Sequence, residues 1–140
     1  MMYFDNLTLK GFVEENSDFF NGARIQKVQQ PTSREFIFTL RNNGETRRFY
    51  ANITPNMHHV CFMSKDNEAK RYLEIPKQPP MFCMLLRKYI ESAKICRVEQ
   101  PFYERILEIY IEAYNELSEK IQVCLAFELM GKHSNIVLYS

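Results

Sequence analysis

Near its end the chain reads Glu128-Leu129-Met130-Gly131-Lys132-His133-Ser134-Asn135-Ile136-Val137-Leu138, a polar cluster between two apolar runs. Two strands joined by a tight turn account for this pattern. Gly131 can adopt a positive φ without a Cβ clash, and Ser134 and Asn135 can bond to the local backbone. Such a turn does not need Lys, His, Ser and Asn side by side. The cluster is therefore either an ordinary solvated hairpin tip, which the local pattern favours, or a binding surface.

Length and composition indicate one globular domain. A chain of 140 residues buries about two-thirds of its unfolded surface. Its 46% hydrophobic and 25% charged residues are globular values, which argues against disorder. A net charge of +1 predicts no partner by itself.

The distribution of charge is more informative than its sum. Residues 99–128 contain seven glutamates against Arg105 and Lys120. Residues 21–48 contain two glutamates and six basic residues, namely Arg24, Lys27, Arg34, Arg41, Arg47 and Arg48. This asymmetry fits either a polarised surface that attracts a polyanion or two ordinary solvated sheet faces, and we weigh the two equally.

The cysteines and the N-terminus point to the cytoplasm. The four cysteines lie beside apolar residues and form no Cys-x-x-Cys pair, so we expect buried free thiols in a reducing compartment. His58 and His59 precede Cys61, but this spacing does not match structural zinc, and we expect no metal and no cofactor. A signal peptide and an apolar run of the roughly 18 residues that span a membrane are both missing, which predicts a cytoplasmic protein without a membrane partner.

Periodicity predicts helices and a meander of strands. Helices are expected over 6–20 and 81–92, where apolar residues recur at helical spacing and Pro80 suits a first turn. Asn42-Asn43-Gly44 is a hairpin signal, and Pro31-Thr32-Ser33 predicts another turn. A long exposed loop is expected over 64–78. Strands are expected over 23–29, 35–40, 46–53, 59–63 and 94–100.

Residues 102–117 fit two kinds of structure. Glutamates at positions 104, 108, 112 and 116 recur every four residues, as on a helix. Ile109, Ile111 and Ala113 also alternate with polar or half-polar residues, as in a strand. Propensity alone leans slightly towards helix.

Two blocks identify a family resemblance. The sequences over 79–90 (PPMFCMLLRKYI) and 128–136 (ELMGKHSNI) resemble the two signature blocks of the NFACT N-terminal domain, found in the RqcH and fibronectin-binding protein A family. Between them, Glu99-Gln100 precedes Glu104-Arg105, where the family carries Asp-Arg after a similar Glu-Gln. The start of the chain also fits, through Phe4-Asp5, Gly22-Ala23-Arg24-Ile25 and Gln29-Gln30-Pro31. The resemblance implies that residues 1–140 are a single domain, the N-terminal fragment of a longer multidomain protein.

The resemblance also implies a fold. It predicts an α+β domain with antiparallel, β-sandwich-like sheets and two main helices, similar to the N-terminal domain of formamidopyrimidine-DNA glycosylase (MutM-like). Residues 104–113 and 119–130 are then two strands of a hairpin, against their local propensity. Glycosylase chemistry needs an N-terminal proline followed by glutamate, whereas this chain begins Met1-Met2-Tyr3-Phe4. We therefore expect neither an enzyme nor a DNA partner.

The function implied by the resemblance is RNA binding in ribosome-associated quality control. Family members bind tRNA and the large ribosomal subunit that carries obstructed peptidyl-tRNA, and in bacteria they support alanine tailing of the stalled chain. Arg105 suits a phosphate or an unpaired base, and Glu128 could orient it. The tRNA-binding residues that the motifs imply are Glu104, Arg105, Glu128, Leu129, Met130, Gly131, Lys132, His133, Ser134 and Asn135.

Two substitutions depart from the family pattern. Glu104 replaces the usual Asp and reaches about one methylene further, which puts tailing in question. Lys132 replaces the commoner Arg, so it keeps the charge but loses the bidentate fork. The alternative function, from the older family label, is a surface adhesin that binds fibronectin or fibrinogen. The missing signal peptide and the unpaired cysteines weigh against it.

Overall fold

The computed structural model describes residues 6–55, 57–63, 78–101, 104–129 and 135–139. Within them it contains two helices, α1 (Asn6–Phe20) and α3 (Met81–Ile90). The first four strands are β1 (Arg24–Thr32), β2 (Glu35–Asn42), β3 (Glu45–Asn52) and β4 (His59–Phe62). The other four are β5 (Lys94–Glu99), β6 (Ile106–Tyr114), β7 (Lys120–Glu128) and β8 (Asn135–Tyr139). The predicted α+β class is confirmed.

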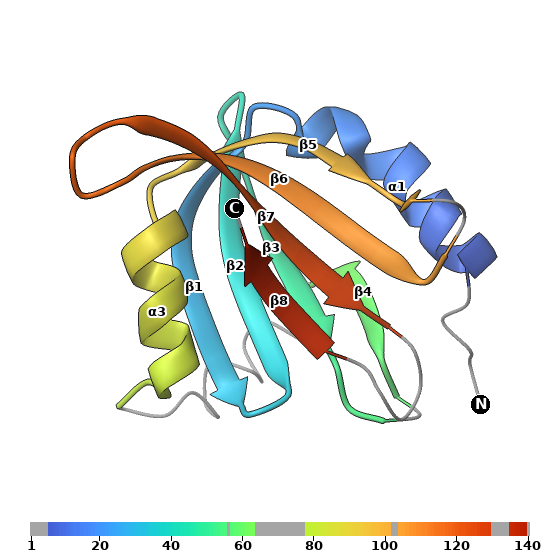
Figure 1. Ribbon diagram of the computed structural model, residues 1–140. Coiled ribbons are helices and arrows are strands. Elements are labelled where there is room, and N and C mark those ends of the chain that lie inside the picture. Colours follow the sequence, from blue (N-terminus) through green and yellow to red (C-terminus); the bar gives the residue numbers. More distant parts are fainter. Residues whose placement is uncertain (1–5, 56, 64–77, 102–103, 130–134, 140) are drawn as a thin grey trace.

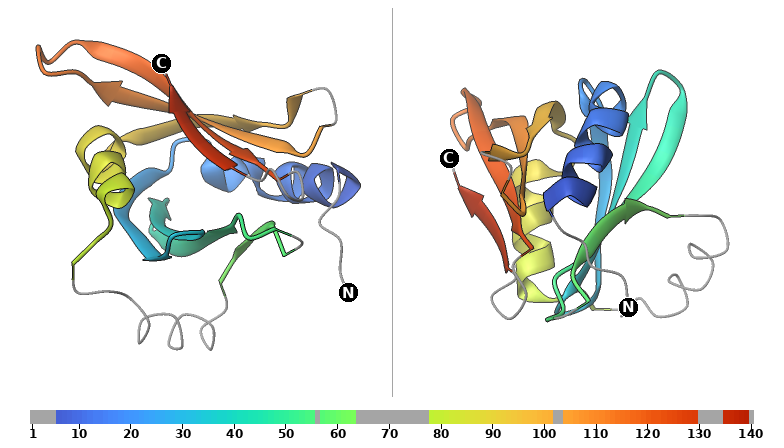
Figure 2. Two further views of the ribbon diagram at one scale, coloured as in Figure 1. Left: turned by 60° about the horizontal axis from the view of Figure 1, so that its bottom comes forward. Right: turned by 90° about the vertical axis from the view of Figure 1, so that its right-hand side faces the viewer.

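The strands form one antiparallel sheet in the order β4-β3-β2-β1-β5-β6-β7-β8. Only one residue pair, Arg24 with Lys94, joins β1 to β5 in the ladder. This narrow junction lets the sheet fold back on itself, so β1–β4 and β5–β8 form two layers with α1 and α3 at either side (Figures 1 and 2). The packing is sandwich-like, as predicted, but the two layers belong to one continuous sheet.

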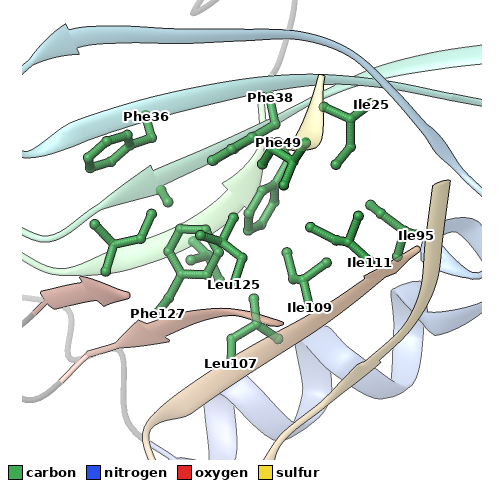
Figure 3. Close-up of a cluster of buried hydrophobic side chains, with 14 of the residues drawn as sticks. Ile25, Phe36, Phe38, Phe49, Ile95, Leu107, Ile109, Ile111, Leu125 and Phe127 are labelled. Atoms are coloured by element: carbon green, nitrogen blue, oxygen red, sulfur yellow. The ribbon is translucent and has the colours of Figure 1, made fainter. Parts of the chain in front are cut away.

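The core lies between the two layers. Phe127 on β7 meets Phe38 and Phe49 from the other layer edge-on, with ring centroids 5.9 and 5.6 Å apart (Figure 3). These rings prefer edge-to-face contact because the positive edge of one faces the negative face of the other. Phe127 and Phe49 are both fully buried. The aromatic contacts therefore hold the two layers together at a level of the sheet where no strand pair joins them.

The two helices close the sides of this core. Phe12 and Phe20 of α1 pack against Phe49 and Phe62, with Phe20 5.4 Å from each of those two rings. Helix α3 covers the edge of β1 that β5 leaves open. There the Arg87 Nε donates to the Val28 carbonyl at 2.8 Å, which satisfies a backbone group that lacks a strand partner.

Local turn chemistry explains the β2–β3 hairpin. Asn43 and Gly44 have φ angles of 51° and 80°, the left-handed conformations that a two-residue type I′ turn requires. The Asn-Gly hairpin prediction is thus confirmed. The turn predicted over 31–33 is shifted, since β1 continues through Pro31 and Thr32 and turns at 33–34. Pro31 is tolerated because the β1–β2 register is irregular between Gln29 and Thr32.

The ambiguous segment is a strand. In β6, Leu107, Ile109, Ile111 and Ala113 are buried, and nine consecutive pairs join β6 to β7. Burying one apolar row against the opposite layer outweighs the slight helical propensity of the segment. The loop predicted over 64–78 falls almost wholly outside the described residues.

All four cysteines are free. Cys83 and Cys124 are buried as predicted, whereas Cys61 and Cys96 are half-buried. In the described part of the chain, no three potential metal ligands of the His, Cys, Asp and Glu types come together. None of the described helices is long and apolar enough to cross a membrane.

Candidate nucleic-acid interface

The residues implied by the motifs meet at one end of the β5–β8 layer. The Leu129 N–H donates to the Arg105 carbonyl at 2.8 Å, just beyond the last β6–β7 pair, Ile106 with Glu128. Glu128 is in turn the partner of Asn135, the first residue of β8. The sheet register therefore brings together Glu104, Arg105, Glu128, Leu129 and Asn135. The predicted site residues Met130, Gly131, Lys132, His133 and Ser134 lie outside the described residues.

The side chains at this end divide into exposed and anchoring ones. Glu104, Arg105 and Asn135 are exposed, Glu128 is half-buried, and Leu129 is 0% exposed. Leu129 thus anchors the end of β7 in the core. The backbone before Arg105 is also held in place, since the Gln100 amide Nε2 donates to the Glu104 carbonyl at 2.8 Å.

The Arg105 guanidinium remains available. Within the described ranges it forms no hydrogen bond and no ion pair, so the expected pairing with Glu128 is not formed. The Glu128 carboxylate lies on the partner strand and forms no described ion pair either. An exposed arginine without a carboxylate partner keeps all five N–H donors for a ligand such as a phosphate.

His58 belongs to the same surface, and sequence reasoning missed it. The pKa of His58 is lowered first by burial and then by the positive charges of Arg105 and His59, so Arg105 lies within electrostatic reach of the β3–β4 connection. The His58 Nδ1 is buried and has no hydrogen-bond partner. His58 is therefore a neutral imidazole at pH 7, within electrostatic reach of a guanidinium that has no ion-pair partner in the described part of the chain. The His-His pair was visible in the sequence, but only the fold brings it to Arg105.

A third connection adds positive charge to this end of the sheet. The carbonyl of exposed Arg34, in the β1–β2 turn, accepts from the Ile53 N–H at 2.8 Å, at the start of the connection that carries His58. We call Arg34, His58 and Arg105, with Asn135, the basic end of the domain. Its two cations, Arg34 and Arg105, come from two separate connections, and neutral His58 comes from a third.

The outward face of β5–β8 has the opposite charge. Glu99 and Glu108 are cross-strand partners there, and the Tyr110 and Tyr139 hydroxyls each donate to Glu108 at 2.9 Å. Burial and the Glu108 carboxylate raise the pKa of Tyr110 to about 12. Arg97 pairs with Glu99 there at 2.8 Å, and we call the part of this face around Glu99 and Glu108 the acidic face.

Solved structures of similar fold were found over almost the whole chain. The N-terminal domain of the fibronectin-binding protein PavA from Streptococcus pneumoniae superimposes with a TM-score of 0.88 at 36% identity, covering 97% of this chain and 49% of that one. The fibrinogen-binding protein from Staphylococcus aureus gives a TM-score of 0.83 at 28% identity, covering 98% and 46%.

Curated sequences show the same relationship. The Rqc2 homologue RqcH of Bacillus subtilis is 36% identical over 137 residues, which is 98% of this chain and 23% of that protein. RqcH of Streptococcus pneumoniae is 38% identical over 138 residues, 98% of this chain and 24% of that protein. The chain thus spans about a quarter of these relatives. A family profile described as "NFACT N-terminal and middle domains" matches residues 5–140, and this chain belongs to that NFACT N-terminal family.

Proposed function

We propose that this domain is an RNA-binding module of a ribosome-associated quality control factor, and that it contacts tRNA through the basic end. The observation that carries the proposal is the exposed Arg105 guanidinium, which has no ion-pair partner among the described residues and lies within electrostatic reach of His58. Its backbone is tied to Leu129, so the free charge sits on a rigid support. Family membership supports the choice of tRNA as the ligand.

Each exposed group has a plausible contact on RNA. The Arg105 fork fits two phosphate oxygens or the plane of an unpaired base, and the Asn135 amide can donate and accept at a base edge. Neutral His58 can stack on a base or bond a 2′-OH without the repulsion that two adjacent cations would suffer. Glu104 repels phosphate, so we expect its carboxylate to face a 2′-OH or a base amino group.

For the full-length protein, we extend the proposal to the large ribosomal subunit with obstructed peptidyl-tRNA and to alanine tailing in the cytoplasm. This domain supplies a tRNA contact and no catalytic group. A MutM-like relationship of the fold, without glycosylase chemistry, is part of the same proposal.

The second candidate function is adhesion to fibronectin or fibrinogen. It is favoured by one observation, that the similar solved structures are described as fibronectin- and fibrinogen-binding proteins. Immobilised fibronectin tested with the wild type and with Arg105→Ala separates the two candidates. Saturable binding to fibronectin together with absent tRNA binding would favour the adhesin.

The test of the tRNA contact is fluorescence anisotropy of labelled tRNA across a salt series, with wild type, Arg105→Ala and the control Lys10→Ala. Lys10 is a cation on α1 that pairs with Glu14 at 3.8 Å, so its removal changes the net charge equally at a different place. Each phosphate contact contributes about −0.7 to the log–log slope for a single strand and about −0.9 for a duplex. We expect the log–log slope of Arg105→Ala to be less steep by one such increment and that of Lys10→Ala to equal the wild-type slope. Equal slopes in all three proteins would overturn the assignment of Arg105.

A further inference from the structure

A second cationic surface lies at the opposite end of the strands, where β1 and β5 meet. The ladder places Arg24 of β1 directly opposite Arg41 of β2 on one side and opposite Lys94 of β5 on the other. Three cations thus occupy three adjacent strands at one level of the sheet, a span of about 10 Å at the usual strand spacing. We call these three residues the cation row.

The cation row is not neutralised from within. The Arg24 guanidinium donates to the Ser92 carbonyl at 2.7 Å, and that of Arg41 donates to the Thr46 hydroxyl at 2.8 Å. None of the three cations forms an ion pair with a carboxylate in the part of the chain that the structure describes. Like charges directly opposite one another destabilise a sheet. Lys94 faces Glu112 on its β6 side, although Glu112 pairs with Lys120 at 3.5 Å, whereas Arg24 has only the cations Arg41 and Lys94 opposite it. An anion bound at the row would offset the repulsion around Arg24.

Two of these cations line a cleft with exposed aromatic rings. The cleft has a volume of about 240 Å³ and is lined by residues from the carboxyl end of α3, the start of β1 and of β5, and the end of β6. Arg24 and Lys94 line it together with Lys88 and with two exposed rings, Tyr89 and Tyr114. The rings are 40% and 62% exposed, enough for a flat group to stack on them.

The acidic residues of the cleft already have cationic partners of their own. Glu112 pairs with Lys120 at 3.5 Å, and Glu91 lies 4.0 Å from Arg87. Lys88 shares its charge with Glu116 at 3.7 Å, so the free positive charge in the cleft is that of Arg24 and Lys94.

The cleft is held in shape by the backbone. Ser92 has a left-handed φ of 73°, and its N–H donates to the Ile25 carbonyl at 2.7 Å. The Ile25 N–H donates to the Ala93 carbonyl at 2.9 Å, and the Ile95 N–H to the Ala23 carbonyl at 2.7 Å. These bonds flank Arg24 and Lys94, so binding does not have to order the backbone that carries them.

We infer that this cleft binds a single-stranded RNA segment, with phosphates on Arg24 and Lys94 and a base stacked on Tyr89. Cationic groups along the backbone, with aromatic rings for the bases, are the usual composition of single-strand sites. The inference rests on the proposed function for the choice of RNA. The cleft is separate from the proposed tRNA contact, because Arg105 lies at the opposite end of the strands.

The test measures anisotropy of a labelled oligouridylate of about eight nucleotides with the 140-residue chain across a salt series. In the double variant Arg24→Gln/Lys94→Gln we expect the log–log slope of affinity against salt to become less steep by about 1.4, because two phosphate contacts of about 0.7 each are lost. At 0.1 M salt this corresponds to an affinity about 25-fold lower. Tyr89→Ala is expected to weaken binding about fivefold or more, whereas Tyr89→Phe keeps the ring and the affinity. Lys10→Gln is the charge-matched control.

Further variants distinguish an effect on folding from an effect on RNA binding. Lys94→Gln removes both the repulsion from Arg24 and the attraction to Glu112 across the ladder, so we expect its melting temperature to change little. Arg105→Ala is expected to weaken tRNA binding while leaving the oligouridylate bound. If Arg105→Ala leaves tRNA binding unchanged while the cleft variants weaken oligouridylate binding, the proposed function is wrong and the inference about the cleft is supported. The inference is overturned if the wild type does not bind the oligouridylate at low salt, or if Arg24→Gln/Lys94→Gln binds it like the wild type.

Discussion

Replacing Phe127 by alanine tests whether the two layers of the sheet are held by the aromatic contact between them. Phe127 is fully buried and meets Phe38 and Phe49 edge-on at 5.9 and 5.6 Å. Truncating a buried phenylalanine costs about 3–5 kcal/mol of unfolding free energy, of which each aromatic pair accounts for about 0.5–1.5 kcal/mol. The expected loss is a large part of a typical stability of about 5–15 kcal/mol.

The assay is urea unfolding followed by far-UV circular dichroism and tyrosine fluorescence, since the chain has eight tyrosines and no tryptophan. Phe127→Leu is the matched control, because leucine fills most of the space, and we expect it to cost about 1–2 kcal/mol. A double-mutant cycle with Phe49→Leu should give a coupling of about 0.5–1.5 kcal/mol. A loss below about 1 kcal/mol for Phe127→Ala, or strict additivity in the cycle, would refute the proposed packing of the layers.

Three other predictions follow from single sites. Gly44→Ala should cost about 1–2 kcal/mol in urea unfolding, because Gly44 has a φ of 80° and a Cβ there has open space but a strained backbone. Arg105→Gln should raise the pKa of His58 measured by NMR, because the charge of Arg105 is one cause of the lowered value. With its lowered pKa, folded wild type binds fewer protons at His58 than the unfolded chain, so the unfolding free energy should fall as the pH drops below about 6.5. This fall should be less steep in the variant. Glu108→Gln should lower the pKa of Tyr110 from about 12, as measured by ultraviolet titration. The stabilisation linked to this raised pKa is complete below about pH 10 and is lost as the pH rises through about 12. An unchanged pKa in the variant would contradict the role of Glu108.

Local chemistry was enough to predict several elements of the fold. The Asn43-Gly44 turn follows from the left-handed conformations that the two residues tolerate, and α3 follows from apolar residues at helical spacing after Pro80. Residues 106–114 could not be assigned in this way, because glutamates every four residues and apolar residues every two coexist there. The burial of Ile109 and Ile111 against the opposite layer decides that case, and burial is a property of the whole fold.

The candidate sites show the same division. Glu104-Arg105 and the block that begins at Glu128 were found from motifs, and the β6–β7 register brings them together. His58 was missed because it approaches Arg105 only through the packing of the two layers. Arg24 and Arg41 of the cation row were counted in the sequence within the basic segment 21–48, whereas Lys94 lies outside it. Its alignment depends on the β1–β2 and β1–β5 registers, which no local pattern reveals.

The most direct test of the central claim is a ¹H–¹⁵N NMR titration of the 140-residue chain with tRNA. The account predicts that the amides of Arg105, Leu129 and Asn135 shift or broaden first, together with the His58 ring, while amides on the acidic face such as Glu108 stay unchanged. Perturbations confined to the acidic face, or a spectrum that does not change at low salt, would contradict the assignment of the basic end as the tRNA contact.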